Sequence, residues 1–442
     1  MILVDDALKR RESEGNPIRV GLIGAGFMGQ GISNQIINSF PGMKLSAIFN
    51  RHIEKAFKAY EYAGQESIIE ANNINQVNDA VKTGRPVVTE DAFLLAQSEY
   101  IDVLLDVTGS VEFGAKVALE AFQNGKDVVL MNAELDATLG PILQTYAEKN
   151  NVILSACDGD EPGVQMNLVR WVEGLGLKPR VIGNIKGLQD PYRNPTTQQE
   201  FADKWGQNPS MVTSFADGSK ISFEQAIVAN ATGFVTKSRG MSRGKKYEGD
   251  IMDIDSIYDI DQVRELGGII DYVVGTPHTK VYCLAEHTDP KQQHYLKLYK
   301  MGDGPLYPFF VPYHLVHFEV PNSIARVSIF RDSIAKPLDG PVVEVCAVAK
   351  RDLKKGETLD DYGMYMTYGE AVNTDEMSRQ RYLPEGLVEG CILKNDISKD
   401  QVITYDDVEL PENRIADKLR AEQYKHFRNE DWLEGYVNSS TV

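Results

Sequence analysis

Carboxylate and lysine side chains that could transfer protons follow two apolar segments in the middle of the chain. Asp158 and Glu161 come soon after the apolar segment 152–156, and Lys186 ends a second, strand-like segment. A lysine buried beside carboxylates can donate a proton to a developing alkoxide, and clustered carboxylates can bind a divalent metal or hold one acid with a raised pKa. Carboxylates are also typical of a helix start, so a structural role stays open.

Two later segments have the composition of an anion-binding site. Lys220 closes the hydroxyl-rich segment 213–220 at an expected helix start. A cation opposes the helix dipole there, which hints at an anionic ligand or a carboxylate partner. Arg239 lies in the basic segment 237–246, which also contains glycines. That composition is typical of a mobile phosphate-binding loop or, alternatively, of a solvated surface loop.

A glycine-rich turn follows the first β-branched apolar segment. Residues 18–23 predict a strand and residues 30–39 predict a helix, which is the context of a dinucleotide-binding turn. The first glycine permits the tight turn, the second lets the backbone approach a pyrophosphate, and the third lets the helix pack close to the strand. The helix N-terminus then offers free N–H groups to the phosphates. The candidate cofactor residues of this turn are Gly24, Gly26, Phe27, Met28 and Gly29.

The end of the next strand bears on which nicotinamide cofactor would bind. An acidic residue at this place would accept hydrogen bonds from the ribose of NAD and repel the 2′-phosphate of NADP. Here Asn50 and Arg51 follow the strand-like segment 44–49. A guanidinium forms paired hydrogen bonds to phosphate oxygens, so this pair favours NADPH over NADH. The alternative is a surface arginine that opens the next helix.

Strands and helices keep alternating up to residue 156, which predicts a parallel sheet with ligands beyond the carboxyl ends of its strands. Four polar or small residues follow two of these strands and could line the nicotinamide side of the site. Each of them could instead be an ordinary turn residue. They are Thr108, Gly109, Asn132 and Glu134.

Composition excludes several other functions. The net charge of −18 repels the phosphate backbone of nucleic acids and anionic membranes, although a basic pocket for an anionic substrate can exist within an acidic surface. The four cysteines lie far apart, which does not suit a disulfide scaffold or a zinc site. The polar, acidic start is no secretory signal, and no apolar run approaches the ~20 residues that span a bilayer. We therefore expect a cytoplasmic protein.

The last part of the chain contains a weak internal repeat. Segments 346–359 and 390–403 each predict a strand, then a charged turn with an aspartate and a Gly or Asp, then another strand. This pattern favours a small β-rich clip. We therefore expect an α/β protein with a Rossmann domain at 1–157, a central α/β domain at 158–338, and a β-clip with a C-terminal tail at 339–442.

With these motifs in hand, the chain resembles a known family along nearly its whole length. The glycine turn, segments 131–141, 158–163, 183–187 and 213–220, and the terminal repeat are together similar to the 1-deoxy-D-xylulose-5-phosphate reductoisomerase-like proteins, which are distantly related to homoserine dehydrogenase. The repeat resembles an SAF domain. The resemblance implies an NADPH-dependent homodimer with a central catalytic and dimerisation domain.

For the best-known members the resemblance implies conversion of 1-deoxy-D-xylulose 5-phosphate, a phosphorylated sugar, to 2-C-methyl-D-erythritol 4-phosphate in isoprenoid precursor synthesis. It would make Lys186 the carbonyl or alkoxide stabiliser, Asp158 and Glu161 acid/base or metal groups, and Arg239 with Lys220 the phosphate holders. A divalent metal is possible and its ligands are unknown. One alternative is a dehydrogenase of the homoserine or sugar-acid type. Another is a non-enzymatic NADPH sensor or carbohydrate-binding protein.

Overall fold

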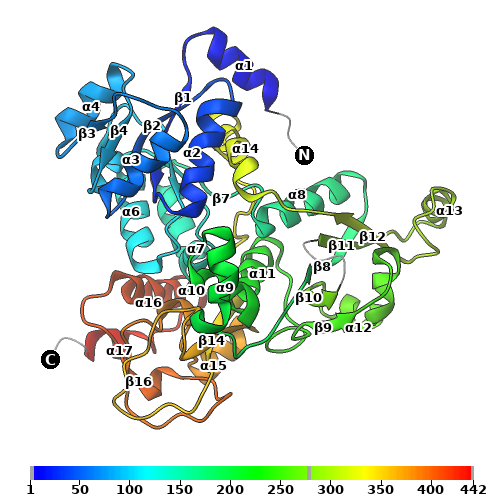
Figure 1. The fold of residues 1–442 in the computed structure, drawn as a ribbon. Helices are drawn as coiled ribbons and strands as arrows, with labels where there is room; N and C mark the ends of the chain where they lie inside the picture. The colour runs from blue at the N-terminus through cyan, green and yellow to red at the C-terminus, as the bar shows by residue number, and fades with distance from the viewer. Residues whose placement is uncertain (1–3, 276–279, 440–442) are drawn as a thin grey trace. The chain divides into compact units, whose positions relative to one another are not determined.

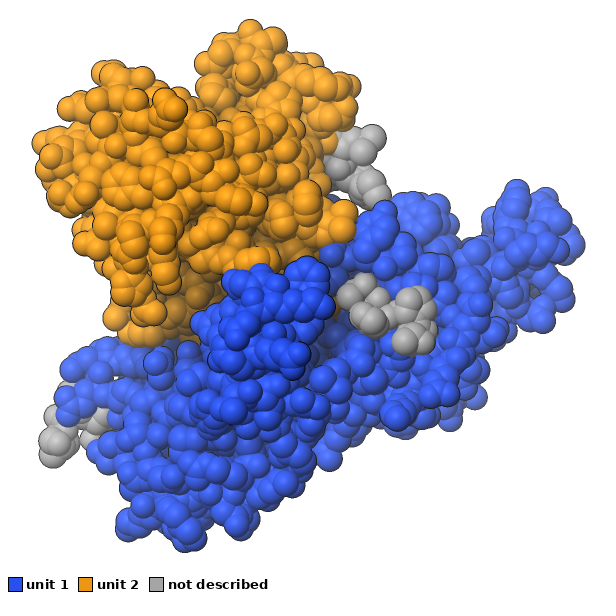
Figure 2. Space-filling model, viewed as in Figure 1, with its two compact units in different colours: residues 1, 164–314, 337–442 blue, residues 2–163, 315–336 orange. Residues whose placement is uncertain are grey.

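The computed structural model describes residues 4–275 and 280–439, and these divide into two compact units (Figure 2). One unit, here called the N-terminal unit, comprises residues 4–163 and 315–336. The other, here called the main unit, comprises residues 164–275, 280–314 and 337–439. Each unit has its own sheet or sheets.

The N-terminal unit is built on a seven-stranded parallel sheet with the strand order β3-β4-β2-β1-β5-β6-β7 (Figure 1). Continuous apolar segments form its central strands because a parallel sheet is covered on both faces. The strands are β1 (Ile18–Ile23), β2 (Met43–Phe49), β3 (Ile69–Glu70), β4 (Val87–Thr89), β5 (Val103–Asp106), β6 (Asp127–Leu130) and β7 (Leu154–Ala156).

Helices alternate with these strands, which confirms the Rossmann-type α/β fold expected for this part. Several helices begin at a side chain that accepts a hydrogen bond from the first turn, for example Ser110 and Asn132. The helices are α1 (Asp5–Ser13), α2 (Phe27–Ser39), α3 (Ile53–Tyr62), α4 (Ile74–Lys82), α5 (Ala92–Gln97), α6 (Val111–Gln123) and α7 (Ala133–Lys149).

A later segment of the chain returns to this unit, which the sequence did not indicate. Residues 315–336 contain the 3₁₀ turn η2 (Val316–Phe318), helix α14 (Val320–Ala325) and the π-turn η3 (Arg326–Phe330). Arg331 forms an ion pair with Asp127 at 2.7 Å. The N-terminal unit is therefore discontinuous in sequence. The expected central domain at 158–338 stays a prediction.

The main unit contains a five-stranded sheet with the order β12-β11-β8-β10-β9. Strands β8 (Lys178–Lys186), β9 (Lys245–Tyr247) and β10 (Ile269–Gly275) are parallel, and β11 (Lys280–Glu286) and β12 (Leu306–Val311) form an antiparallel edge. The helical elements are α8 (Glu161–Gly174), α9 (Pro195–Trp205), α10 (Pro209–Asp217), α11 (Ser219–Thr232), η1 (Ile251–Ile257), α12 (Ile260–Glu265) and α13 (Pro290–Leu298).

Helix α11 is buried around its whole circumference, from Ser219 to Ala231. It packs against β10 of the five-stranded sheet and against β13 and β14 of the C-terminal part. A helix that is buried on all sides has little amphipathic character. Burying its polar side chains costs free energy unless they form hydrogen bonds or ion pairs. The polar residues of α11 are therefore informative about the site.

The C-terminal part of the main unit has the antiparallel pair β13 (Val343–Ala349) and β14 (Thr367–Asn373) and the short pair β15 (Ile392–Leu393) and β16 (Val408–Glu409). The remaining elements are α15 (Thr374–Gln380), η4 (Glu385–Leu387), η5 (Tyr405–Asp407), α16 (Ile415–Arg428) and α17 (Glu434–Ser439).

The two copies of the repeat form hydrogen bonds with each other through residues at matching positions. Leu353 and Ile397, each seven residues after the start of its segment, exchange two backbone hydrogen bonds of 2.8 and 3.0 Å. Asp396 accepts from the backbone N–H of Lys355 at 2.9 Å, and Asp352 accepts from that of Lys399 at 2.9 Å. The expected small β-rich clip is thus a pair of interlocked copies.

Candidate functional site

The glycine-rich turn has the geometry of a phosphate-binding loop. Gly24 has a φ of +110°, and its N–H donates to the carbonyl of Phe49 on β2 at 2.9 Å. A side chain at Gly29 would overlap the carbonyl oxygen of Gly24, so only glycine lets α2 begin this close to β1. Gly26 is exposed and a Cβ there would meet nothing within 4 Å. The turn therefore leaves open space in front of the N-terminus of α2, beside exposed Phe27.

The strand that follows ends at the candidate cofactor-selecting residues. The Asn50 side chain accepts a hydrogen bond from the backbone N–H of His52 at 3.0 Å, so Asn50 shapes the turn. Arg51 is exposed, and no ion pair among residues 4–275 and 280–439 involves it. An arginine without a carboxylate partner is free to bind a phosphate.

The residues expected on the nicotinamide side gather around the buried carboxylate of Asp106. Asn132 donates to Asp106 at 2.9 Å and accepts from the N–H of Leu135 as the first residue before α7. The backbone N–H of Thr108 donates to the other Asp106 oxygen at 2.9 Å. Burial raises the pKa of the Asp106 carboxyl, while these two donors oppose the rise. Asn132 is thus committed to the scaffold that shapes this strand end.

Two other residues of the same group remain near the strand ends. Gly109 has a φ of +69°, so it supplies a turn that favours glycine. Glu134 is buried in the first turn of α7, and its charge also contributes to the raised pKa of Asp106. Their contact with a cofactor stays a prediction.

Asp158 is held in a buried ion pair within the N-terminal unit. Its carboxylate accepts from Arg326 at 3.0 Å and from the hydroxyl of Ser323 at 2.9 Å, and Asp158 and Arg326 are almost fully buried. The Arg326 guanidinium also bonds to Asp332. This network joins the turn after β7 to α14 and η3, which favours a structural role for Asp158. Glu161 is buried at the start of α8.

Lys186 and Lys220 lie next to one carboxylate in the main unit. Lys186, at the end of β8, forms an ion pair with Glu224 at 3.4 Å, and the Glu224 side chain is 4% exposed. Lys220 and Glu224 are four residues apart on α11, so they lie on the same face of that helix. Lys220 is also buried. We call these three residues the lysine cluster, and it can hold a substrate oxygen or move a proton.

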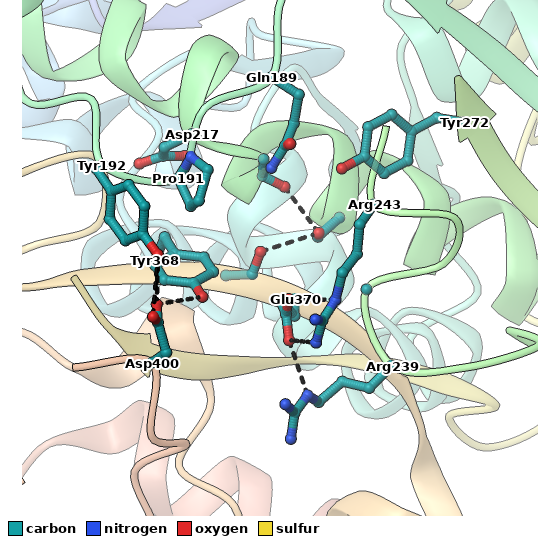
Figure 3. Close-up of a pocket in the computed structure, with 14 residues that line it drawn as sticks. Gln189, Pro191, Tyr192, Asp217, Arg239, Arg243, Tyr272, Tyr368, Glu370 and Asp400 are labelled. Carbon is teal, nitrogen blue, oxygen red and sulfur yellow. Dashed lines mark hydrogen bonds and ion pairs between the residues drawn. The ribbon is translucent and has the colours of Figure 1, made fainter. Parts of the chain in front are cut away.

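Arg239 lies elsewhere in the main unit. Its guanidinium donates to Glu370 on β14 at 2.8 Å, and it lines a pocket of about 270 Å³ (Figure 3). The segment around it is held in place, because Ser242 bonds to Asp271 through both its backbone and its hydroxyl. Whether this segment acts as a phosphate-binding loop or as a solvated surface loop stays a prediction. Arg239 thus lies in a pocket that neither Lys186 nor Lys220 lines.

Side chains that the sequence patterns did not single out line the same pocket. Glu370 and Tyr368 come from β14, Tyr272 from β10, and Asp400 from the second repeat copy. Of these four residues, only Asp400 could have been noticed in the sequence. It occupies the position at which the first copy of the repeat has a glycine, Gly356. The others are ordinary residues of strands, and only the fold brings them together.

The described residues do not fit a metal centre. Within 4–275 and 280–439, no three His, Cys, Asp or Glu side chains are grouped so that they could hold a metal ion. The carboxylate of Asp158, the first candidate ligand, is instead bound by a guanidinium and a hydroxyl.

In the same described residues, no helix combines the length and apolar character that crossing a membrane requires.

Three domain families match successive parts of the chain. Residues 24–155 match the homoserine dehydrogenase NAD-binding domain, residues 159–320 match the catalytic domain of oxidoreductase DRL, and residues 344–409 match the SAF domain. The first match covers the glycine turn and the third covers both copies of the repeat. A nicotinamide-binding domain, a catalytic domain and a clip therefore follow one another in the order expected.

The curated relatives are homoserine dehydrogenases. The enzyme of Pseudomonas aeruginosa is 23% identical over 266 residues, which are 51% of this chain and 57% of that protein. The enzyme of Corynebacterium glutamicum is 40% identical over 68 residues, 15% of each chain. This chain thus spans little more than half of the first relative and a small part of the second.

Solved structures similar to the chain include two inositol dehydrogenases of Lactobacillus casei. Myo-inositol dehydrogenase in complex with NAD(H) and myo-inositol is 12% identical with a TM-score of 0.34, and the match covers 68% of each chain. Apo scyllo-inositol dehydrogenase is 14% identical with a TM-score of 0.34, covering 61% of this chain and 65% of that one. Likenesses this distant support no functional conclusion. The three domain matches do: the chain is an oxidoreductase with a nicotinamide-binding domain, and it is similar to the DRL-like oxidoreductases that carry a C-terminal SAF domain, as its motifs predicted.

Proposed function

We propose that this protein reduces a small carbonyl compound with NADPH. The observation that carries the proposal is the open space at Gly26, in front of the N-terminus of α2. A helix N-terminus presents unpaired N–H groups and a partial positive charge, which together bind a pyrophosphate. The tight packing of Gly29 against Gly24 fixes this turn for that purpose.

The choice of NADPH over NADH follows from the end of β2. Asn50 carries no charge that would repel a 2′-phosphate, and Arg51 is exposed beside it. The residue that selects NAD in this fold is an aspartate or glutamate that binds the ribose hydroxyls, and Asn50 stands in its place. Arg51 would hold the 2′-phosphate through paired, charge-assisted hydrogen bonds.

The lysine cluster would supply the proton chemistry. NADPH, when bound, supplies a hydride to the carbonyl carbon. Lys186 Nζ would donate to the carbonyl oxygen and stabilise the charge that develops on it. Glu224, 3.4 Å from Lys186, would keep the ammonium group oriented, and Lys220 on the same helix face would hold a second substrate oxygen. Glu161 is a further buried candidate for moving a proton.

For the substrate we propose a phosphorylated sugar of the 1-deoxy-D-xylulose 5-phosphate type, since the family resemblance covers nearly the whole chain. A specific observation also favours a plain dehydrogenase of the homoserine type: no group of carboxylates among the described residues suits the metal that a reductoisomerase uses. We derive no step through a metal. The hydride step and the roles of the lysine cluster are common to both candidates.

Two further parts of the proposal concern the setting of the enzyme. We propose a cytoplasmic location, and the four cysteines support it because all are buried free thiols, as a reducing compartment maintains. We also propose a homodimer, on the family resemblance alone. Sedimentation at equilibrium would test the dimer.

The proposal is tested by following NADPH oxidation with three substrates. 1-Deoxy-D-xylulose 5-phosphate is offered with and without magnesium, and aspartate 4-semialdehyde and a keto-sugar acid serve as the alternatives. Turnover with the sugar phosphate supports reductoisomerase activity, and turnover with only the others supports a plain dehydrogenase. Tight NADPH binding with no turnover on any of the three would refute these substrates and leave the cofactor assignment standing. Failure to bind NADPH would refute the whole proposal.

A further inference from the structure

A polar pocket lies in the main unit between the central sheet and the C-terminal clip (Figure 3). It has a volume of about 270 Å³ and is lined by residues of β14, of the second repeat copy and of the central domain. Its lining residues on the central side include Gln189, Gly218 and Ser222. We call it the junction pocket.

The junction pocket and the lysine cluster lie on opposite sides of α11. Ser222 lines the pocket, whereas Glu224 pairs with Lys186. Residues two apart on an α-helix are separated by about 200° around its axis. Gly218 and Ser222 therefore share one side of α11, and Lys220 and Glu224 share the other. A ligand in the pocket would be separated from the proposed reaction chemistry by the helix itself.

One end of the pocket carries an excess of positive charge. Arg239 donates to Glu370 at 2.8 Å, and Arg243 pairs with the same carboxylate at 3.1 Å. Two guanidinium groups thus share one carboxylate, which leaves one positive charge unbalanced. The Arg243 side chain is 57% exposed, so it can turn its remaining N–H groups to a ligand without breaking a buried contact. Such an end suits a phosphate or a carboxylate.

The other end carries groups that bind hydroxyls. Asp400 accepts hydrogen bonds from the hydroxyls of Tyr192 at 3.0 Å and Tyr368 at 3.3 Å, and Figure 3 shows the three side chains gathered away from the arginines. Lys399 covers one face of the Tyr192 ring. Tyrosine and aspartate oxygens that already accept or donate one bond can still accept from a ligand hydroxyl.

A tyrosine side chain also forms part of the pocket wall. Tyr272 is 3% exposed as a whole residue, and Figure 3 shows it on the wall of the pocket. A tyrosine hydroxyl there can donate a hydrogen bond to a ligand oxygen or accept one from a ligand hydroxyl. Asp217, another wall residue, is paired with Lys350 at 2.8 Å.

The backbone at Asp400 points to the same conclusion. Asp400 has a φ of +66°, in the left-handed region that favours glycine. The first repeat copy has Gly356 at the equivalent position, with a φ of +87°. The second copy therefore keeps a side chain where the turn itself would be better served by glycine, and that side chain is the one in the pocket. Strained positions of this kind cluster at ligand sites.

We propose that the junction pocket binds a small hydroxylated anion at a site separate from the reaction site. Its phosphate or carboxylate lies at Arg239 and Arg243, and its hydroxyls lie at Tyr272 and Asp400. The volume equals about nine water molecules at about 30 Å³ each, which suits a ligand of three or four carbons. The proposal goes beyond the reduction reaction and does not depend on it.

Calorimetric titration of the full-length protein tests this directly. The probes are glycerol 3-phosphate and D-glycerate, with inorganic phosphate and glycerol as probes that offer the anion or the hydroxyls alone. We expect one of the first two to bind more tightly than either control probe, and the tighter one identifies phosphate or carboxylate as the anion. Affinities all weaker than about 1 mM would overturn the proposal, as would phosphate alone binding as well as the best probe.

Variants locate the binding. Arg243→Gln should weaken it about tenfold or more, since a charge-assisted hydrogen bond is lost, and Tyr272→Phe about fivefold. Arg351→Gln is the matched control, because Arg351 is a similarly exposed, ion-paired arginine of the clip outside the pocket. Equal losses in Arg243→Gln and Arg351→Gln would overturn the assignment.

Two more variants distinguish the junction pocket from the reaction site and test its hydroxyl-binding end. Lys186→Met should leave the affinity of the probe unchanged, and a loss of binding there would show that the probe occupies the reaction site. Asp400→Gly should weaken binding, and the relief of the backbone at φ +66° should offset part of the stability lost with the hydrogen bonds from Tyr192 and Tyr368. If Asp400→Gly binds as well as the wild type, the hydroxyl end of the pocket is refuted.

Discussion

Replacing Gly26 by alanine separates the cofactor-binding role of the glycine turn from its folding role. The backbone at Gly26, with φ −75° and ψ −160°, is extended and open to any residue. A Cβ there would meet no protein atom within 4 Å. The substitution should therefore leave the free energy of unfolding unchanged or raise it by about 0.4–1 kcal/mol, since alanine restricts the unfolded chain.

The same methyl group would occupy the space through which a pyrophosphate reaches the N–H groups of α2. Losing one charge-assisted hydrogen bond costs about 1.5–3 kcal/mol, which corresponds to at least about tenfold in the dissociation constant of NADPH. Fluorescence titration of NADPH and urea unfolding of the same samples measure the two effects. The expected result for Gly26→Ala is weak NADPH binding by a protein of normal stability.

Gly29→Ala is the contrasting variant. Its Cβ would overlap the carbonyl oxygen of Gly24 and lie 3.1 Å from the carbonyl carbon, so the turn or α2 has to shift. Forced overpacking of this kind costs about 1–3 kcal/mol, and this variant should lose stability and NADPH binding together. If Gly26→Ala binds NADPH like the wild type, the pyrophosphate does not lie at this turn and the reasoning is refuted.

Three other predictions follow from buried charges and from Arg51. Burial raises the pKa of Asp136 to about 7. Between about pH 4 and pH 7 the folded protein therefore keeps a proton that the unfolded chain has lost. The free energy of unfolding consequently falls as the pH rises through this range. At about pH 8 the buried charge of Asp136 destabilises the fold by about 4 kcal/mol. Asp136→Asn removes that charge and should therefore raise the thermal midpoint more at about pH 8 than at about pH 5. Equal effects at both pH values would contradict this. Arg326→Met leaves Asp158 without its guanidinium partner and should cost about 3–5 kcal/mol in urea unfolding, whereas near-neutral stability with lost turnover would instead make Asp158 an acid/base group. Arg51→Ala should weaken NADPH binding about tenfold or more and leave NADH binding unchanged, measured by titration with both cofactors; equal losses would show that Arg51 does not contact the 2′-phosphate.

Local features of the fold could be predicted because their physical causes lie within a few residues. The strand at 18–23, the glycine turn and the start of α2 follow from β-branched residues and from glycines at fixed spacing. The two copies of the repeat likewise predicted a β-rich clip, and the pairing of Leu353 with Ile397 explains why both copies have apolar residues at that place.

Features that depend on distant parts of the chain could not be predicted. Nothing near Arg326 in the sequence shows that it neutralises Asp158, which lies 168 residues away. The sequence alone therefore predicts an acid/base or metal role for Asp158 and places segment 315–336 in the central domain, whereas the structure groups that segment with the N-terminal unit. The partners in a buried ion pair are brought together by the fold, so they cannot be identified from their spacing in the sequence.

The candidate site was predicted in part for the same reason. Lys186 stood out as a single lysine in an apolar strand, and Lys220 as a cation at a helix start. The structure confirms that strand and that helix start, while the roles of both lysines in the reaction stay a prediction. The pairing of Lys186 with Glu224 and that of Arg239 with Glu370 depend on how β8, α11 and β14 pack. The basic composition around Arg239 suggested a phosphate ligand, and the structure gives Arg239 a carboxylate partner and a pocket of its own.

The central claim is that NADPH bound at the glycine turn is oxidised with the help of Lys186. The most direct measurement mixes NADPH-saturated wild-type enzyme, and separately Lys186→Met, with 1-deoxy-D-xylulose 5-phosphate and follows the loss of NADPH absorbance. We expect the wild type to oxidise NADPH, and Lys186→Met to bind it equally well but to turn over about 10²- to 10⁴-fold more slowly, as for the loss of a general acid. Equal rates in the two proteins would contradict the role of Lys186, and no oxidation by the wild type would contradict the proposed substrate.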